Sequence, residues 1–324
     1  MIDLLAIQPH KISTDLSSYA TLIYGNEKAG KTTFMHELFG DDMLLVATEK
    51  GYLARAGVNA VDVPRWKEFT DVIRQLKKPE VKARFKVIVF DTADLLYDMA
   101  VKHILLVNGI DKLGDIPFGG GYKMVDDLFK DALLEIQGMG YGLGFISHSV
   151  MEVNEDTGVT KFRPSVNKRG GAIINKMVDT IGFAYLKEVD GEEKRTLYLR
   201  ETLNFKAGCR FRFVAPAIPL DAKVFQEEIA KAIAKEGEMD ANSVTDVKAN
   251  RVQFEEELNF EELMNDLRGM ALKFKEAEQL PHYTKVIENH LGKERKVSEL
   301  VAGQEEIMSI ILDELAEISK ELGI

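Results

Sequence analysis

The chain has 324 residues, of which 45% are hydrophobic and 29% charged, and its formal net charge is −11. This length and apolar content allow a substantial core and fit one large domain with a smaller one. No apolar run reaches the roughly 18 residues of a membrane span, and the opening residues lack the basic segment of a secretory signal. We therefore expect a cytoplasmic protein that is neither inserted into a membrane nor secreted and that has no membrane partner. A single cysteine, Cys209, excludes an internal disulfide.

The acidity is uneven along the chain. From Asp240 onward there are 10 Lys and Arg against 19 Asp and Glu, which leaves 32 against 34 for residues 1–239. The excess negative charge thus belongs mostly to the C-terminal part. A nucleic-acid partner for the rest of the chain is not excluded by the total.

The strongest signal is a glycine-rich run between an apolar strand, expected at Thr21–Tyr24, and a helix expected from about Lys31 to Leu38. The Gly-x4-Gly-Lys-Thr spacing of Gly25–Thr32 is that of a P-loop, whose backbone N–H groups cradle phosphates. Its lysine reaches the β and γ oxygens, its threonine ligates Mg²⁺, and the helix N-terminus adds a favourable dipole. ATP and Mg²⁺ are therefore the expected cofactors. The expected nucleotide-binding residues are Gly25, Asn26, Glu27, Lys28, Ala29, Gly30, Lys31, Thr32 and Thr33.

After this motif, strands and helices alternate. The run Phe85–Asp91 is almost continuously apolar and β-branched, which is typical of a parallel strand buried on both faces. This alternation predicts an α/β fold with a mostly parallel sheet flanked by helices. Further strands are expected at Met43–Ala47, Val58–Val63 and Leu143–Ser147, and helices at Trp66–Leu76, Ala93–Val107 and Tyr122–Gln137.

The C-terminal half begins with a strand hairpin around Asp190-Gly191 and ends in helices. The helices are expected at Phe254–Phe274, Tyr283–Leu291 and Gln304–Leu322, and their apolar stripes are expected to pack on one another. The predicted division is a lead-in at 1–19, an ATPase core at 20–236, an acidic linker at 237–253 and a helical C-terminal region at 254–324.

Polar residues follow three of the expected strands at their carboxyl ends, where ligands of parallel sheets gather. Asp91 fits the Walker B role of holding Mg²⁺ together with Thr32, although it could instead cap the next helix. Glu49 could orient the attacking water, or it could be a solvated loop residue. His148 could bond the γ-phosphate, or it could be a structural histidine. The expected catalytic residues are Lys31, Glu49 and His148.

A basic stretch, Gly158–Lys176, carries five cations, three glycines and no acid. Such a flexible patch suits phosphate contacts, and an aromatic side chain within it could stack on an exposed base. The preceding Glu152, Glu155 and Asp156 are acidic, and a solvated hairpin is the alternative interpretation. The candidate DNA-binding residues are Lys161, Phe162, Arg163, Lys168, Arg169 and Lys176.

The order of these features resembles the RecA/RadA superfamily, and most of all the short phage RecA-like P-loop ATPases of single-strand annealing and recombination. The resemblance covers about residues 12–232. It is carried by Tyr24–Thr33, Ala47–Gly51, Val87–Asp91, Gly119–Tyr122 and Phe145–His148.

The resemblance implies a Mg²⁺-dependent, DNA-stimulated ATPase that acts on single-stranded DNA as a ring or filament of identical subunits in the cytoplasm of a bacterial host. Glu49 would be the catalytic carboxylate, and His148 would be the γ-phosphate sensor, where RecA has glutamine. Met151–Lys176 would be the mobile DNA-binding loop. Candidates for a basic finger that enters a neighbour's site are Lys206, Arg210 and Arg212, with Arg200 nearby.

Other functions remain open from the sequence. One is an ATP-dependent loader or adaptor in a replication complex, whose helical C-terminal region would bind a replication or recombination protein. A ring helicase motor is another. A small-molecule kinase is disfavoured, because the expected loop Gly109–Gly121 contains no arginine for a lid.

Overall fold

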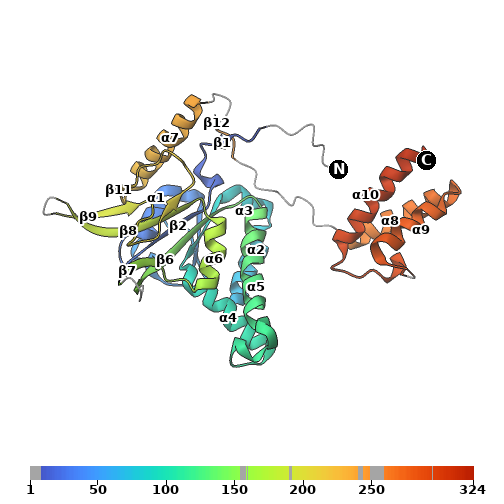
Figure 1. The fold of residues 1–324 in the computed structure, drawn as a ribbon, viewed down its shortest axis with the longest axis horizontal. Helices are drawn as coiled ribbons and strands as arrows, with labels where there is room; N and C mark the ends of the chain where they lie inside the picture. The colour runs from blue at the N-terminus through green and yellow to red at the C-terminus, as the bar shows by residue number, and fades with distance from the viewer. Residues whose placement is uncertain are drawn as a thin grey trace. The chain divides into compact units, whose positions relative to one another are not determined.

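A mostly parallel sheet runs through the larger of two units in the computed structural model (Figure 1). The structure describes residues 9–153, 158, 160–189, 192–239, 244–248, 259–293 and 295–324. One unit lies between Pro9 and Gln253, and the other contains residues 259–324. None of the described helices is long and apolar enough to cross a membrane.

Within the described residues the sheet has ten strands, in the order β11-β9-β8-β2-β6-β5-β3-β4, with β10 beside β8 and β7 beside β6. The pairs from β8 to β4 are parallel, and β7, β9, β10 and β11 pair in antiparallel fashion. The first core strand, β2, thus lies between β6 and β8, and the predicted α/β class with a mostly parallel sheet flanked by helices is confirmed. The strands are β2 (Thr21–Gly25), β3 (Met43–Ala47), β4 (Ala60–Asp62), β5 (Val87–Asp91), β6 (Gly142–Val153), β7 (Thr160–Pro164), β8 (Thr180–Val189), β9 (Glu192–Tyr198), β10 (Gly208–Cys209) and β11 (Ala217–Pro219).

Helices cover both faces of the sheet, because alternate strand residues point to opposite sides and both sides are apolar. In β5, Ile88 and Phe90 join the core on one face, and Val87 and Val89 join the core on the other. The first face carries α2 (Trp66–Leu76), α4 (Ala93–Asn108), α5 (Gly120–Gly138) and α6 (Lys168–Met177). The second carries α1 (Lys31–Phe39) and α7 (Ala222–Met239), and the short α3 (Pro79–Arg84) precedes β5.

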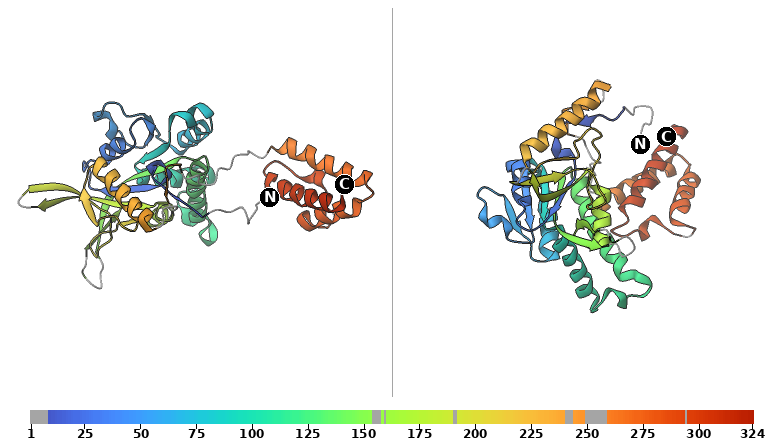
Figure 2. Two further views of the ribbon diagram at one scale, coloured as in Figure 1. Left: turned by 90° about the horizontal axis from the view of Figure 1, so that it is seen from above. Right: turned by 60° about the vertical axis from the view of Figure 1, so that its left-hand side comes forward.

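The carboxyl ends of the parallel strands meet at one edge of the sheet, and this edge carries the P-loop. The β6–β7 and β8–β9 hairpins extend from the same edge (Figures 1 and 2). Glycine is required where β2 ends, because a Cβ on Gly25 would collide with the carbonyl oxygen of Ala184 on β8. The fold therefore brings the phosphate loop and two hairpins to one place.

The segment before β2 is tied to the end of the larger unit. Its strand β1 (Ile12–Ser13) pairs in parallel with β12 (Val244–Thr245). Part of the stretch expected to be an acidic linker, 237–253, is therefore core structure, because α7 continues to Met239 and β12 pairs with β1. Residues 240–243 and 249–253 lie outside the described residues.

The smaller unit consists of α8 (Phe260–Glu276), α9 (Leu280–Leu291) and α10 (Glu305–Leu322) in its described part. Its core contains the fully buried Leu267, Phe274 and Ile311. The side chain of Asn259 caps α8 by accepting hydrogen bonds from two backbone N–H groups. The apolar stripes of these helices pack on one another, so the unit has a core of its own. Residues 254–258 of the first expected helix lie outside the described part.

Candidate nucleotide-binding site

The P-loop leaves β2 at Gly25 and enters α1 at Lys31. Gly30 has a φ of 97°, a conformation that favours glycine. The Lys31 side chain is only 6% exposed, and its Nζ donates to the carbonyl oxygens of Gly25 at 3.0 Å and Asn26 at 2.7 Å. Burial lowers the pKa of Lys31, while the carboxylates of Asp91, Asp94 and Glu49 oppose that shift. A buried ammonium held by loop carbonyls can exchange those carbonyls for phosphate oxygens, so the residues present fit a nucleotide.

The hydroxyl of Thr32 meets the carboxylate of Asp91, as the Mg²⁺ prediction requires. Thr32 Oγ1 donates to Asp91 Oδ2 at 2.7 Å, and Asp91 is only 5% exposed. Asp91 does not cap α4, because the N-cap position is Thr92. Hydroxyl and carboxylate oxygens are suitable Mg²⁺ ligands. No group of three His, Cys, Asp or Glu that could hold a metal ion is found in the described ranges.

Asp91 is expected to reduce stability in the absence of nucleotide. Burial raises its pKa above the ordinary value, and the hydrogen bond from Thr32 opposes this only in part. The folded state therefore holds the proton more tightly than the unfolded state does. Stability falls as the pH rises from the ordinary Asp pKa through the raised pKa, and it stays lower above that range.

Asp91→Asn should consequently raise the Tm of the metal-free protein at neutral pH, by about 2–4 °C for each kcal/mol of relief. The gain should vanish in acid, below the ordinary Asp pKa, and hydrolysis should be lost. Thermal unfolding at two pH values measures this, with the exposed Asp111→Asn as the matched control. A lower Tm for Asp91→Asn at neutral pH would contradict it.

Glu49 and His148 face each other beside the P-loop. Glu49 Oε1 lies 3.2 Å from His148 Nε2, and the backbone N–H of Glu49 donates to the carbonyl of Asp91 at 3.2 Å. His148 is in register with Gly25, although β6 continues beyond it to Val153. Its Nδ1 is buried without a hydrogen-bond partner in the described part of the chain. The edge thus brings together a carboxylate that can hold water and a ring that positions it.

Asp94, which the sequence interpretation did not select, is another carboxylate at this edge. It lies in the first turn of α4, and its Oδ2 accepts hydrogen bonds from the backbone N–H of His148 at 3.3 Å and from the Ser165 hydroxyl. Its Oδ1 is buried and has no partner among the described residues. Asp94 therefore ties the start of α4 to β6. The sequence feature that could have identified Asp94 is its position three residues after Asp91.

Arg195 of β9 was also missed. A Cβ built on Gly30 would lie 3.4 Å from Arg195 Nη1, so the guanidinium lies over the P-loop turn. No ion pair in the described part of the chain involves Arg195. An unpaired guanidinium beside a phosphate-binding turn can donate to an anionic ligand.

Arg195→Ala is therefore expected to weaken binding of a non-hydrolysable ATP analogue by about tenfold, the loss of one charge-assisted hydrogen bond. Titration with a fluorescent analogue measures it. Lys194→Ala is the control, because Lys194 pairs with Glu192 on the same strand. Equal affinity of the Arg195 variant and the wild type would remove Arg195 from the site.

A family described as an AAA domain, AAA_24, matches residues 17–211, more than half of the chain. The chain belongs to this family of AAA domains. The SPbeta prophage-derived uncharacterized protein YorG of Bacillus subtilis (strain 168) is 26% identical over 328 residues, 99% of each chain.

Two solved structures are similar to this AAA domain at low levels. A KaiC-like protein of Pyrococcus horikoshii OT3 matches with a TM-score of 0.34 and 14% identity, covering 57% of this chain and 79% of that one. Flagellar accessory protein FlaH of Methanocaldococcus jannaschii matches with a TM-score of 0.32 and 11% identity, covering 56% and 77%.

The described part of the basic stretch forms a strand and a helix, whereas the resemblance implied a mobile DNA-binding loop at Met151–Lys176. Residues 160–164 form β7, which pairs with β6, and residues 168–177 form α6, which Asn167 caps. Gly170 is needed for packing, because a Cβ there would overlap the ring of Tyr97. Glu155 and Asp156 lie outside the described residues.

The candidate DNA-binding residues are thereby divided between two elements. Lys161, Phe162 and Arg163 lie on β7, and Lys168, Arg169 and Lys176 lie on α6. Four of the cations have carboxylate partners: Lys161 with Glu201 at 2.6 Å, Arg163 and Lys168 with Glu152 at 2.9 and 3.2 Å, and Arg169 with Asp126 at 2.5 Å.

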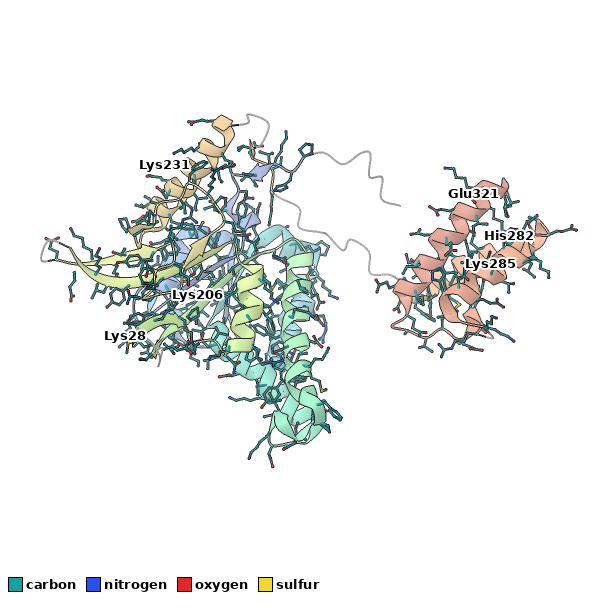
Figure 3. All side chains as sticks on the ribbon, in the orientation of Figure 1. Lys28, Lys206, Lys231, His282, Lys285 and Glu321 are labelled. Atoms are coloured by element: carbon teal, nitrogen blue, oxygen red, sulfur yellow. The ribbon has the colours of Figure 1, made fainter. Side chains whose placement is uncertain are left out.

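The three finger candidates and the nearby Arg200 have separate surroundings. Arg200 donates to the carbonyls of Cys209, Phe211 and Arg212, so its guanidinium braces a turn. Arg210 pairs with Asp179 at 2.9 Å, and the guanidinium of Arg212 lies 5.2 Å from the ring centre of Phe213. Lys206, labelled in Figure 3, is half-buried, and burial lowers its pKa. That one of the finger candidates acts in trans, in a neighbour's nucleotide site, stays a prediction.

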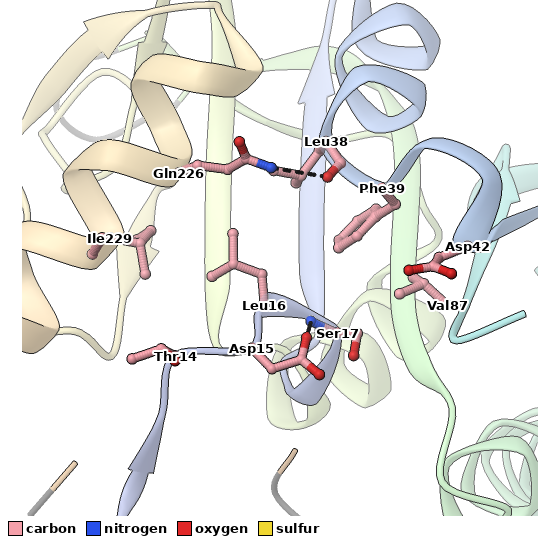
Figure 4. A pocket seen from close by; sticks show the side chains of 11 residues that line it. Thr14, Asp15, Leu16, Ser17, Leu38, Phe39, Asp42, Val87, Gln226 and Ile229 are labelled. Atoms are coloured by element: carbon pink, nitrogen blue, oxygen red, sulfur yellow. Dashed lines mark hydrogen bonds between the residues drawn. The ribbon is translucent and has the colours of Figure 1, made fainter. Parts of the chain in front are cut away.

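A cavity of about 380 Å³ (Figure 4) is lined by residues 14–17 before β2 and by Val87 at the start of β5, so it lies at the end of these strands away from the P-loop. It is lined by the turn before β2, the end of α1 and α7, and Gln226 there donates to the carbonyl of Leu38 at 3.1 Å. Its position excludes it as the place where the P-loop would hold phosphates.

Proposed function

We propose that this AAA domain hydrolyses ATP with Mg²⁺ and acts on single-stranded DNA in phage-type homologous recombination or strand annealing. The observation that carries the ATPase part is the meeting of Lys31, the Thr32–Asp91 pair and the Glu49–His148 pair at one sheet edge. These groups supply what phosphoryl transfer to water needs, namely charge on the phosphates and a carboxylate for the nucleophile.

Each of these residues has its own role in the proposed hydrolysis. Lys31 leaves the loop carbonyls to hold the β and γ oxygens, and Thr32 and Asp91 would hold Mg²⁺, which neutralises charge on the phosphates when bound. Glu49 accepts a hydrogen bond from the attacking water. His148 Nε2 lies 3.2 Å from Glu49 Oε1 and fixes the orientation of this carboxylate. His148 Nδ1 is buried and has no hydrogen-bond partner among the described residues, and we assign this histidine the role of γ-phosphate sensor from its place at the end of the core part of β6.

The DNA part of the proposal is supported by continuity between the site and a basic hairpin. The strand that carries His148 continues as the first strand of the β6–β7 hairpin, whose second strand holds Lys161 and Arg163. A change at His148 can therefore reach the hairpin along one strand. The prophage-derived name of the Bacillus relative supports a phage context and, with it, a bacterial cytoplasm. Assembly into a ring or filament, with ATP between subunits, belongs to the same proposal.

A second candidate function is a loader or adaptor in a replication complex. It is favoured by the smaller unit, which has its own core and could bind a protein partner. Removing residues 259–324 discriminates the two functions. A recombination ATPase keeps DNA-stimulated hydrolysis after this truncation, whereas a loader loses its partner.

Steady-state ATP hydrolysis with and without single-stranded DNA tests the proposal, with double-stranded DNA as the comparison. Preferential stimulation by single strands is expected. A rate that neither DNA changes would contradict action on DNA and would favour the loader.

A further inference from the structure

Six aromatic rings form a cluster beside the P-loop strand. They come from β2, β7, β8, β9 and the segment after β9. Phe183 lies at the centre and is buried, with the ring centres of Tyr24, Phe162, Tyr185, Phe205 and Tyr198 at 4.9, 5.4, 5.4, 5.2 and 6.3 Å. We call the four outer rings that remain partly accessible the aromatic platform: Phe162, Tyr185, Tyr198 and Phe205.

The platform is accessible and lies among cations. Tyr185 is 37% exposed, and Leu203, two residues before Phe205 in the sequence, is 80% exposed. Lys206 has no ion pair in the described part of the chain, and its backbone N–H donates to the carbonyl of Phe162 at 3.0 Å. Residues 160–164 and 200–206 together carry Lys161, Arg163, Arg200 and Lys206, and the carboxylates paired with these cations are Glu201, on Lys161, and Glu152 of β6, on Arg163, so cations are in excess here in a chain of net charge −11. Rings with accessible faces in a locally positive surface fit unpaired bases on a phosphate backbone.

Tyr24 connects the platform to the P-loop. Its hydroxyl donates to the carbonyl of Lys206 at 2.5 Å and lies 3.2 Å from the carbonyl of Phe162. The next residue is Gly25, whose carbonyl holds Lys31 Nζ at 3.0 Å. A shift of the segment around Lys206 therefore acts on the same short piece of backbone that positions the phosphate-binding lysine.

We propose that the aromatic platform binds unpaired bases of a single-stranded nucleic acid, and that Tyr24 transmits the binding of these bases to the P-loop. This rests on the single-stranded DNA function proposed above. It places DNA on β7, β8, β9 and the segment at 205–206, and not on α6, where the other three predicted contacts lie. Tyr24 is a positioning residue, because it touches neither nucleotide nor DNA in this arrangement.

Fluorescence anisotropy of a labelled oligothymidylate with the full chain tests whether the aromatic platform binds the bases. Tyr185→Ala is expected to raise the Kd about tenfold, as loss of one base-stacking partner does. Tyr122→Ala is the matched variant, because Tyr122 is 43% exposed and stacks under Arg169 beside α6. It should leave the Kd within about twofold, well below one stacking contact. A loss of affinity with Tyr122→Ala and none with Tyr185→Ala would place the base-binding surface at α6 and overturn the proposal.

Tyr24→Phe tests the connection, because it keeps the ring and removes only the hydroxyl. The ratio of DNA-stimulated to unstimulated hydrolysis is expected to fall severalfold, while the oligothymidylate Kd stays the same. An unchanged ratio would overturn the role of Tyr24.

The outcomes separate this inference from the proposed function. A wild-type chain that does not bind oligothymidylate contradicts both. A wild-type chain that binds it, with Tyr185→Ala and Phe205→Ala binding equally well, overturns the platform alone. If Tyr185→Ala changes the sedimentation of the protein but not the Kd, the rings are an interface between copies, and the platform is likewise overturned.

Discussion

Lys31→Ala is expected to reduce ATP hydrolysis by at least about a hundredfold, the usual effect of removing a preorganised group that stabilises charge in the transition state. The fold should persist, because in the described part of the chain Lys31 Nζ hydrogen-bonds carbonyls of its own loop, Gly25 and Asn26, and water is expected to hydrate them in the variant. Steady-state hydrolysis and circular dichroism measure the two effects.

The control for this substitution is Lys67→Ala, since Lys67 lies on α2 and its side chain is 75% exposed. It should retain the wild-type rate. Turnover by purified Lys31→Ala at the rate of this control would show that the P-loop assignment is wrong.

Glu49→Gln should separate binding from chemistry. The amide keeps the size of the side chain and can still hydrogen-bond His148 Nε2, so nucleotide affinity should stay within about twofold of the wild type, less than one lost hydrogen bond would cause. It cannot act as a base toward water, and hydrolysis should fall by about 10²–10⁴-fold. Analogue titration and hydrolysis assays measure the two quantities.

Glu37→Gln is the matched control, because Glu37 pairs with Arg55 on the surface of α1. Its rate should equal that of the wild type. If Glu49→Gln hydrolyses ATP as fast as Glu37→Gln does, another group activates the water, and Asp94 is then the carboxylate to replace next.

The sheet and the meeting of its polar residues could be predicted from the sequence. The apolar run ending at Asp91 belongs to a strand buried on both faces, and its residues alternate between the two cores. Helix α2 has the bounds that its periodicity predicts, Trp66–Leu76. Because the carboxyl ends of parallel strands share an edge, Glu49, Asp91 and His148 were expected to lie near Lys31, and they do. Their catalytic roles stay predictions.

The contacts that depend on distant segments could not be predicted. Arg195 reaches Gly30 only because β9 folds back beside β8, and no local spacing records this. The glycines of the basic stretch were interpreted as flexibility, but Gly170 is small because Tyr97 packs against it. Phe162 was selected as a lone stacking residue, whereas it belongs to a cluster assembled from five parts of the chain.

The central claim is that ATP and single-stranded DNA bind at one edge of the sheet and influence each other. The affinity of the full chain for oligothymidylate, measured with no nucleotide, with ADP and with a non-hydrolysable ATP analogue and Mg²⁺, tests it most directly. The analogue should tighten binding at least about fivefold relative to ADP, the lower end of typical coupling between sites. Equal affinity in all three conditions would contradict the claim.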